Sequence, residues 1–128
     1  MRALLDTHAL LWWLSDDPAL SRRAREAIAA VKNTLIVSAA SAWEVATKVR
    51  IGKLPTAANL AADFAGQLKR EGFEALSIST EHAVRAGSLA GSLKDPFDRM
   101  LIAQAQAENV PLISNEALFD AYGIRRLW

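Results

Sequence analysis

The sequence contains no cysteine among its 128 residues. This absence excludes disulfide frameworks, thiolate zinc sites and cysteine nucleophiles, and it agrees with a reducing cytoplasm, where we expect the protein to act. Glycine is scarce, with six residues, and no glycine-rich phosphate-binding loop is present. The two histidines, His8 and His82, form no Ser-His-Asp order with other residues. The chemistry must therefore come from other side chains.

Long hydrophobic runs and an excess of one charge are also missing. Asp6 and His8 interrupt the apolar N-terminal stretch, and no small-residue cleavage site follows it, so we expect no signal peptide and no membrane association. The net charge of +1 is too balanced to indicate nucleic-acid binding by itself. With 52% hydrophobic and 23% charged residues, the chain should fold as one globular domain over residues 1–128.

Short apolar segments alternate with helical patterns along the chain. Such alternation predicts an α/β fold of three layers, with a central, mostly parallel twisted sheet of four to five strands between helices. Ser21, Ser41 and Thr80 are candidate N-caps, and Gly52 is a candidate C-cap. We expect strands at 2–6, 34–38, 73–79, 111–114 and 124–128, and helices at 7–17, 20–31, 41–52, 60–72, 80–91, 95–110 and 115–123.

Acidic residues recur at one end of this predicted sheet. Asp6 ends the first strand, and Glu44 lies about one turn into the helix that follows the second. Asp95 and Asp98 open the helix before the strand at 111–114, and Glu116 comes directly after that strand. Functional sites of open α/β sheets lie beyond the carboxyl ends of the strands. These acids are therefore candidates for one site.

Taken singly, most of these acids have a simpler interpretation. Asp95 suits an N-cap, Asp98 a first-turn acid that complements the helix dipole, and Glu116 the start of a helix. Glu44 could pair with Lys48, four residues further on.

Taken together, these carboxylates would repel one another and raise each other's pKa unless a cation lies among them. Oxygen ligands without cysteine favour Mg²⁺, or Mn²⁺, over zinc. Such a site suits hydrolysis of phosphodiesters.

Four segments resemble one bacterial family in their order and spacing. They are LLDTHALLWWL, SAASAWEVATKVRIGKL, DPFDRMLIAQAQAENVPLIS and FDAYGIRRLW. They are similar to PIN-domain proteins and, more narrowly, to the VapC-type toxins of type II toxin–antitoxin operons, over nearly the whole chain. The resemblance implies a PIN-like fold and a metal-dependent ribonuclease. It places Asp6, Glu44 and Asp98 in three positions of an acidic quartet that binds the metal, with Asp95 as a further acid.

The fourth position of the quartet departs from the family pattern. The family usually has Asp there, whereas this chain has Glu116 in Ser114-Asn115-Glu116. Direct ligation by Glu116 is therefore open, although its extra methylene could still let it reach a metal through water. Ser114 matches a position where the family often has a hydroxyl that positions a water or an acid.

Basic and aromatic residues suggest the partners. We expect RNA to follow the basic residues near the acids, with solvated helix-end charges as the alternative; these residues are Lys48, Arg50, Lys53, Lys94 and Arg99. Tryptophan is enriched at interface hot spots, so Trp12, Trp13 and Trp43 are either contact residues or core residues. The resemblance implies a homodimer and a cognate VapB-type antitoxin that binds near the first helices and the helix around Glu44.

Two other functions compete with the ribonuclease. A PIN fold with a degenerate site could serve only as a binding module, and the departure at Glu116 keeps this alternative open. A metal-dependent phosphatase of the haloacid-dehalogenase type would need a second Asp two residues after Asp6, where this chain has His8. Receiver domains need paired acids after the first strand and a lysine after a late one, and neither pattern is present.

Overall fold

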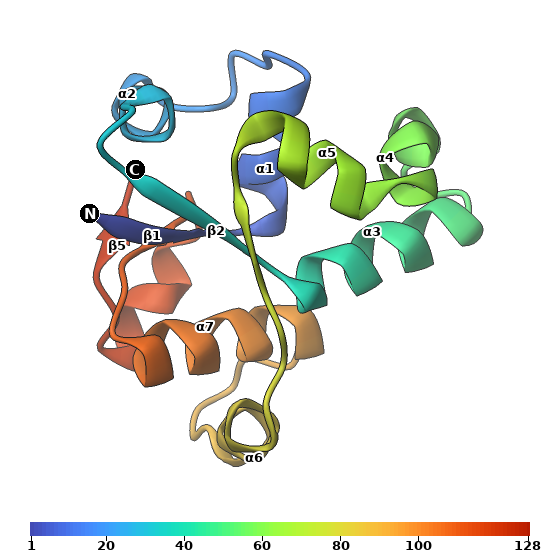
Figure 1. The fold of residues 1–128 in the computed structure, drawn as a ribbon. Coiled ribbons are helices and arrows are strands. Elements are labelled where there is room, and N and C mark those ends of the chain that lie inside the picture. The colour runs from blue at the N-terminus through green and yellow to red at the C-terminus, as the bar shows by residue number, and fades with distance from the viewer.

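A five-stranded sheet forms the centre of the computed structural model, which describes residues 1–128 (Figure 1). All neighbouring strands are parallel, in the order β3-β2-β1-β4-β5. In the central register, Leu5 lies opposite both Val37 and Ile113. The predicted α/β fold with a parallel sheet is confirmed. The strands are β1 (Arg2–Leu5), β2 (Thr34–Ser38), β3 (Glu74–Leu76), β4 (Leu112–Ile113) and β5 (Arg126–Leu127).

Helices cover both faces of the sheet because successive strand side chains point to opposite faces. Leu5 and Val37 belong to one buried cluster, beneath α1 (Thr7–Leu14), α2 (Arg22–Ala29) and α5 (Phe64–Glu71). Leu4 and Ile36 belong to a second cluster on the opposite face. That face is covered by α7 (Pro96–Glu108) and the 3₁₀ helix η2 (Ala117–Tyr122), with α6 (Thr80–Ser88) packed outside α7 (Figure 1).

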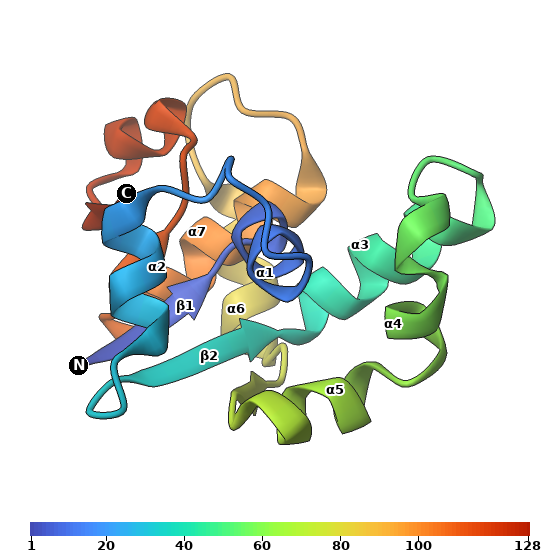
Figure 2. The same cartoon turned by 90° about the horizontal axis from the view of Figure 1, so that it is seen from above.

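A helical arm leaves the carboxyl end of β2. It consists of α3 (Ala39–Arg50), η1 (Pro55–Ala57) and α4 (Ala58–Ala62), and it extends away from the strands (Figure 2). The helix predicted over 60–72 is in fact two, because Asp63 has a non-helical φ of −146° and caps α5 by accepting from the Gly66 N–H at 3.1 Å. None of the helices combines the length and the apolar character that crossing a bilayer requires.

Two of the predicted caps are wrong by a few residues. Ser38, not Ser41, caps α3, because β2 runs directly into the helix and the Ser38 hydroxyl accepts from the Ala40 N–H at 2.9 Å. Ser79, not Thr80, caps α6, where His82 completes a capping box. The predicted cap Ser21 is confirmed, and Gly52 follows the α3 cap with a φ of +79°.

Candidate active site

The strand order places a crevice between β1 and β4. The chain leaves β1 toward β2 on one side, whereas β4 lies on the other, and ligands of open α/β sheets bind at such switch points. Asp6 directly follows β1 and Ser114 directly follows β4. The Asp6 N–H donates to the Ile113 carbonyl at 3.0 Å, which fixes the two strand ends together. The topology therefore aligns the first predicted acid with the predicted hydroxyl.

Asp6 is a buried carboxylate held from two directions. Only 5% of the residue is exposed, and its Oδ1 accepts from the Ala9 N–H at 2.7 Å as the cap of α1. Burial raises the pKa of Asp6 above its ordinary value, while hydrogen bonds from Ser114 and from the Ala9 backbone oppose that rise. Ser114 is itself fully buried. It therefore positions an acid and has no surface to offer a substrate.

Glu44 is the second buried acid, and it already has a partner. It lies in α3 with 3% of the residue exposed, and its Oε2 forms an ion pair with Lys48 Nζ at 2.5 Å. The simpler interpretation of Glu44, a pair with Lys48, is thus what the structure shows. The charge of Glu44 nevertheless also raises the pKa of both Asp6 and Asp98. Glu44 therefore belongs to the acidic cluster as well.

The paired aspartates have different positions at the start of α7. Asp95 caps the helix, its Oδ1 accepting from the N–H groups of Phe97 at 2.8 Å and Asp98 at 3.1 Å. Pro96 occupies the first helical position, where its missing N–H costs nothing. Asp98 therefore lies in the first turn of the helix, half-buried and within reach of the charges of the other acids.

The pKa of Asp98 reflects both its burial and the other carboxylates near it. Burial is the main cause that raises the pKa of Asp98 from 3.8 to about 7, and the negative charges of Asp95, Glu44, Asp6 and Glu116 add to it, in that order. Four different segments of the chain contribute these charges. The structure thus brings all five predicted acids to one region at the carboxyl ends of the strands.

Glu116 has a structural role as the N-cap of η2. It caps η2, its Oε1 accepting from the Leu118 N–H at 3.3 Å, and its own N–H donates to the Ser114 hydroxyl at 3.0 Å. The alternative interpretation, that it begins a helix, therefore holds. Its charge still acts on Asp98, and direct ligation by Glu116 stays a prediction.

Comparison with known proteins identifies the family. The PIN domain profile matches residues 3–124. The chain belongs to the PIN-domain family. The resemblance inferred from the four segments is confirmed.

Individual relatives of this PIN domain point the same way. It is 37% identical over 67 residues to Ribonuclease VapC16 of Mycobacterium tuberculosis, a match that covers 50% of this chain and 48% of that protein. The chain thus matches only about half the length of this relative.

Solved structures share the whole PIN fold. VapBC2 of Rickettsia felis, solved bound to a DNA fragment from their promoter, has a TM-score of 0.72 at 20% identity, covering 98% of this chain and 97% of that one. VapC20 of Mycobacterium tuberculosis, a sarcin-ricin loop cleaving toxin, has a TM-score of 0.70 at 14% identity, covering 95% of each chain. At such identities the likeness shows the fold.

Arg99 has a structural role in this PIN domain that the sequence did not reveal. Its guanidinium donates to three backbone carbonyls: Ala86 at 3.0 Å, Leu89 at 2.6 Å and Leu93 at 2.8 Å. It therefore ties the end of α6 and the following loop to α7. Three of its five N–H donors are thus engaged by the fold, and a contact of Arg99 with RNA stays a prediction.

The other predicted basic residues differ in availability. Lys48 is engaged by Glu44. Arg50, Lys53 and Lys94 are exposed and take part in none of the ion pairs of the structure. These three stay predicted contacts for RNA.

The PIN domain's donors fit a hard divalent cation by their chemistry. They are carboxylate oxygens. Burial, and after it four neighbouring negative charges, raise the pKa of Asp98, and a bound cation would offset both effects. In the present side-chain positions no three acidic or histidine side chains form a ready-made cage for one ion. Direct coordination by Asp6, Glu44 and Asp98 would therefore require side chains to turn, and a metal at Glu44 would compete with Lys48 for the carboxylate charge.

A buried hydroxyl pair next to the acids was missed at the sequence level. Thr7 Oγ1 donates to Ser41 Oγ at 2.9 Å, and both residues are buried. This bond joins the start of α1 to α3, one residue after Asp6 and three before Glu44. The only signal for it in the sequence was the position of Thr7 directly after Asp6, which by itself did not indicate a partner.

Proposed function

We propose that the protein is a metal-dependent ribonuclease, the toxin component of a VapBC-type toxin–antitoxin system, that hydrolyses RNA phosphodiesters. The observation that carries this proposal is the gathering of five carboxylates at the β1/β4 crevice of a PIN domain. A relative named Ribonuclease VapC16 supports the activity, and the VapC20 fold supports RNA as the substrate class.

Asp6, Glu44 and Asp98 are the residues that would hold Mg²⁺, with Mn²⁺ as an alternative. A bound divalent cation would supply Lewis-acid chemistry, neutralising charge on the phosphate and lowering the pKa of a water. Ser114 and the Ala9 N–H fix the Asp6 carboxylate, and Asp95 fixes the helix start that carries Asp98. Because the pKa of Asp98 is about 7, this group can hold or release a proton near neutral pH in the metal-free protein.

The test is cleavage of RNA by purified protein freed of any partner. Wild type should cut single-stranded RNA with Mg²⁺ or Mn²⁺ and stop with EDTA, and Asp98→Asn should lose at least about 100-fold in rate. Glu81→Gln is the matched control, because Glu81 is also a first-turn acid, on α6, but stands apart from the cluster. Equal rates for wild type and Asp98→Asn would refute the assignment.

The proposed RNA path uses the uncommitted basic residues. Each phosphate contact makes binding more salt-dependent. Replacing Arg50 and Lys53 with alanine should therefore flatten the dependence of RNA affinity on salt concentration, measured by fluorescence anisotropy without metal. An unchanged slope would place the path elsewhere.

A VapB-type antitoxin and a second copy of the chain are the proposed partners. Solved proteins of the same fold include VapBC complexes. Trp43 is 60% exposed and lies edge-on to Phe97, with ring centroids 4.8 Å apart, which suits a contact residue. Trp12 and Trp13 pack against the core, as the alternative interpretation held. Light scattering should give a dimer, and adding the operon partner should abolish cleavage; a monomer indifferent to that partner would contradict both.

A second candidate is a PIN-fold binding module without catalysis. The Glu44–Lys48 pair and the capping role of Glu116 favour it, since both engage acids that catalysis would need. Calorimetry separates the two functions. The ribonuclease should bind Mn²⁺ and lose that binding in Asp6→Asn, whereas a degenerate module would bind Mn²⁺ poorly from the start.

A further inference from the structure

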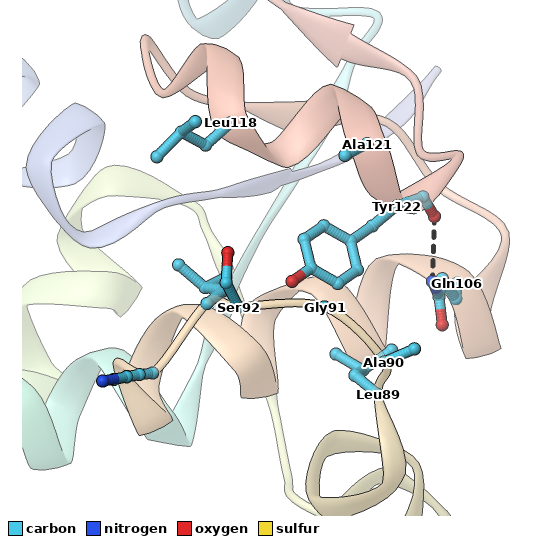
Figure 3. A pocket seen from close by; sticks show the side chains of 10 residues that line it. Leu89, Ala90, Gly91, Ser92, Gln106, Leu118, Ala121 and Tyr122 are labelled. Carbon is cyan, nitrogen blue, oxygen red and sulfur yellow. Dashed lines mark hydrogen bonds between the residues drawn. The ribbon is translucent and has the colours of Figure 1, made fainter.

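A groove adjoins the acidic cluster on the η2 side. It lies between the loop at 89–94 and η2, with Gln106 of α7 at its base, and has a volume of about 830 Å³ (Figure 3). The loop leads directly into Asp95, and η2 begins directly after Glu116. Both walls are therefore continuations of the segments that carry the acids. Gln106, which holds Tyr122, lies eight residues after Asp98 on α7, about 12 Å along the helix. An RNA strand with a phosphate at the acids would therefore reach this groove further along the strand.

The groove is built before any ligand arrives, because both walls are tied to α7. Gln106 Nε2 donates to the Tyr122 carbonyl at 2.9 Å, which holds η2 (Figure 3). Arg99, seven residues before Gln106 on α7, donates to the carbonyls of Leu89 and Leu93 and so holds the loop. Neither wall depends on the ligand for its position.

Tyr122 lies at the centre of the groove, with its ring between the loop and η2 (Figure 3). Gly91 lets the loop approach it: the residue has a φ of +93°, and a Cβ there would come within 2.7 Å of the Tyr122 hydroxyl. Leu118, 67% exposed, adds an apolar wall on the η2 side. Lys94 is the only charged residue of the lining, and it is positive.

We propose that this groove binds an unpaired nucleobase of the RNA strand that is cut, with Tyr122 as the stacking partner. A base offers a flat face to an aromatic ring and edges to polar groups such as the Ser92 hydroxyl, while its phosphate carries the charge that Lys94 complements. A pocket of this size and mixed lining suits a small flat group. The inference rests on the proposed ribonuclease function and makes Tyr122 a residue that determines which RNA is cut.

The test combines changes in the protein with changes in the RNA. A short single-stranded RNA that is cut at one mapped bond is compared with copies in which each base near that bond is removed in turn. For wild type, removal of one particular base should lower kcat/KM by about tenfold or more, as loss of a base–aromatic stack does. The same removal should lower kcat/KM by less than about threefold in Tyr122→Leu, because this variant has already lost the aromatic ring on which the base stacks.

Three further variants separate stacking from folding. Tyr122→Phe keeps the ring, so base removal should lower kcat/KM in this variant by the same factor as in wild type. Leu118→Ser changes an exposed wall without disturbing the core, and should reduce the effect of base removal. Val84→Ser is the matched control, since Val84 is similarly exposed, at 63%, on α6 away from the groove. It should leave the effect of base removal unchanged.

Several results would overturn the proposal. One is that base removal has the same effect in wild type, Tyr122→Leu and Leu118→Ser. Another is that these variants cut RNA normally but resist the antitoxin, which would make the groove a protein-binding surface. The affinity for intact and base-free RNA, measured in EDTA, gives a readout without cleavage. Base-dependent binding by a protein that does not cut RNA would refute the ribonuclease function and leave base binding by the groove standing. Cleavage that does not depend on the base would refute base binding by the groove alone.

Discussion

Replacing Asp98 with asparagine should make the metal-free protein more stable, although the same change should abolish activity. Asp98 is half-buried among the charges of Asp95, Glu44, Asp6 and Glu116, and burial together with these charges raises its pKa from 3.8 to about 7. Above pH 7 the folded protein must therefore carry a carboxylate in a place that disfavours it. Asparagine has nearly the same shape and no charge, so it removes this cost.

The size of the effect follows from the pKa of Asp98. Each pH unit between the folded and unfolded pKa corresponds to about 1.4 kcal/mol, so the full difference is about 4 kcal/mol. Because the side chain is only half-buried, solvent screening roughly halves that figure. Asparagine also loses the favourable interaction of a first-turn acid with the dipole of α7, about 0.5 kcal/mol. The expected net gain at pH 8 is about 1–2 kcal/mol.

The dependence on pH has a definite sign. Between pH 4 and 7 the folded state binds more protons at Asp98 than the unfolded state does, so wild-type stability from this group falls as pH rises. Below about pH 4 both states are protonated and the cost is absent. The gain from Asp98→Asn should therefore be smallest near pH 4, grow through this window and level off above pH 7.

Urea unfolding in EDTA at several pH values measures this gain. Glu81→Gln is the control, because Glu81 also lies in the first turn of a helix but pairs with Arg85 on the surface; it should lose a few tenths of a kcal/mol at every pH. Mg²⁺ should then reverse the order of wild type and Asp98→Asn. If Asp98→Asn destabilises the metal-free protein at pH 8, Asp98 is a structural residue and the acids do not repel one another.

Three more outcomes test the surroundings of the site. In Arg99→Lys the side chain cannot reach three carbonyls at once, so the free energy of unfolding in urea should fall by about 2–4 kcal/mol. A decrease below about 1 kcal/mol would mean that Arg99 does not stabilise the loop. Ser114→Ala should raise the pKa of Asp6 further, as a carboxyl NMR titration without metal would detect, since it removes a hydroxyl donor. Lys48→Gln should tighten Mg²⁺ binding severalfold in calorimetry, because a cation that competes for Glu44 is gone; weaker binding would show that Lys48 supports the site.

The parts of the fold that the sequence predicted are those specified by local pattern. Strand β2 was predicted with its exact bounds, since TLIVS is apolar and β-branched. The start of α7 was predicted because Asp-Pro specifies a cap and a first turn together.

The caps failed where several hydroxyls compete. Both Ser38 and Ser41 suit an N-cap, and the choice between them depends on where β2 ends. That point is set by its pairing with β3, in which Ser38 lies opposite Leu76. Nothing within the helix segment carries this information, because the partner strand is more than 30 residues away in the chain.

In the candidate site, too, the sequence predicted features that depend on neighbouring residues and missed one that depends on contacts distant in the chain. Asp6 was predicted because a carboxylate at the end of an apolar strand stands out against its neighbours. The other acids were predicted because they recur near the carboxyl ends of the strands, where sites of open α/β sheets lie. The role of Arg99 was missed because its acceptors are backbone carbonyls, which every residue has and no sequence pattern marks. An arginine beside a candidate site acid therefore looks the same in sequence whether its guanidinium binds a phosphate or backbone carbonyls. Only the path of the 89–94 loop decides between them, and here that path places three carbonyls around the guanidinium.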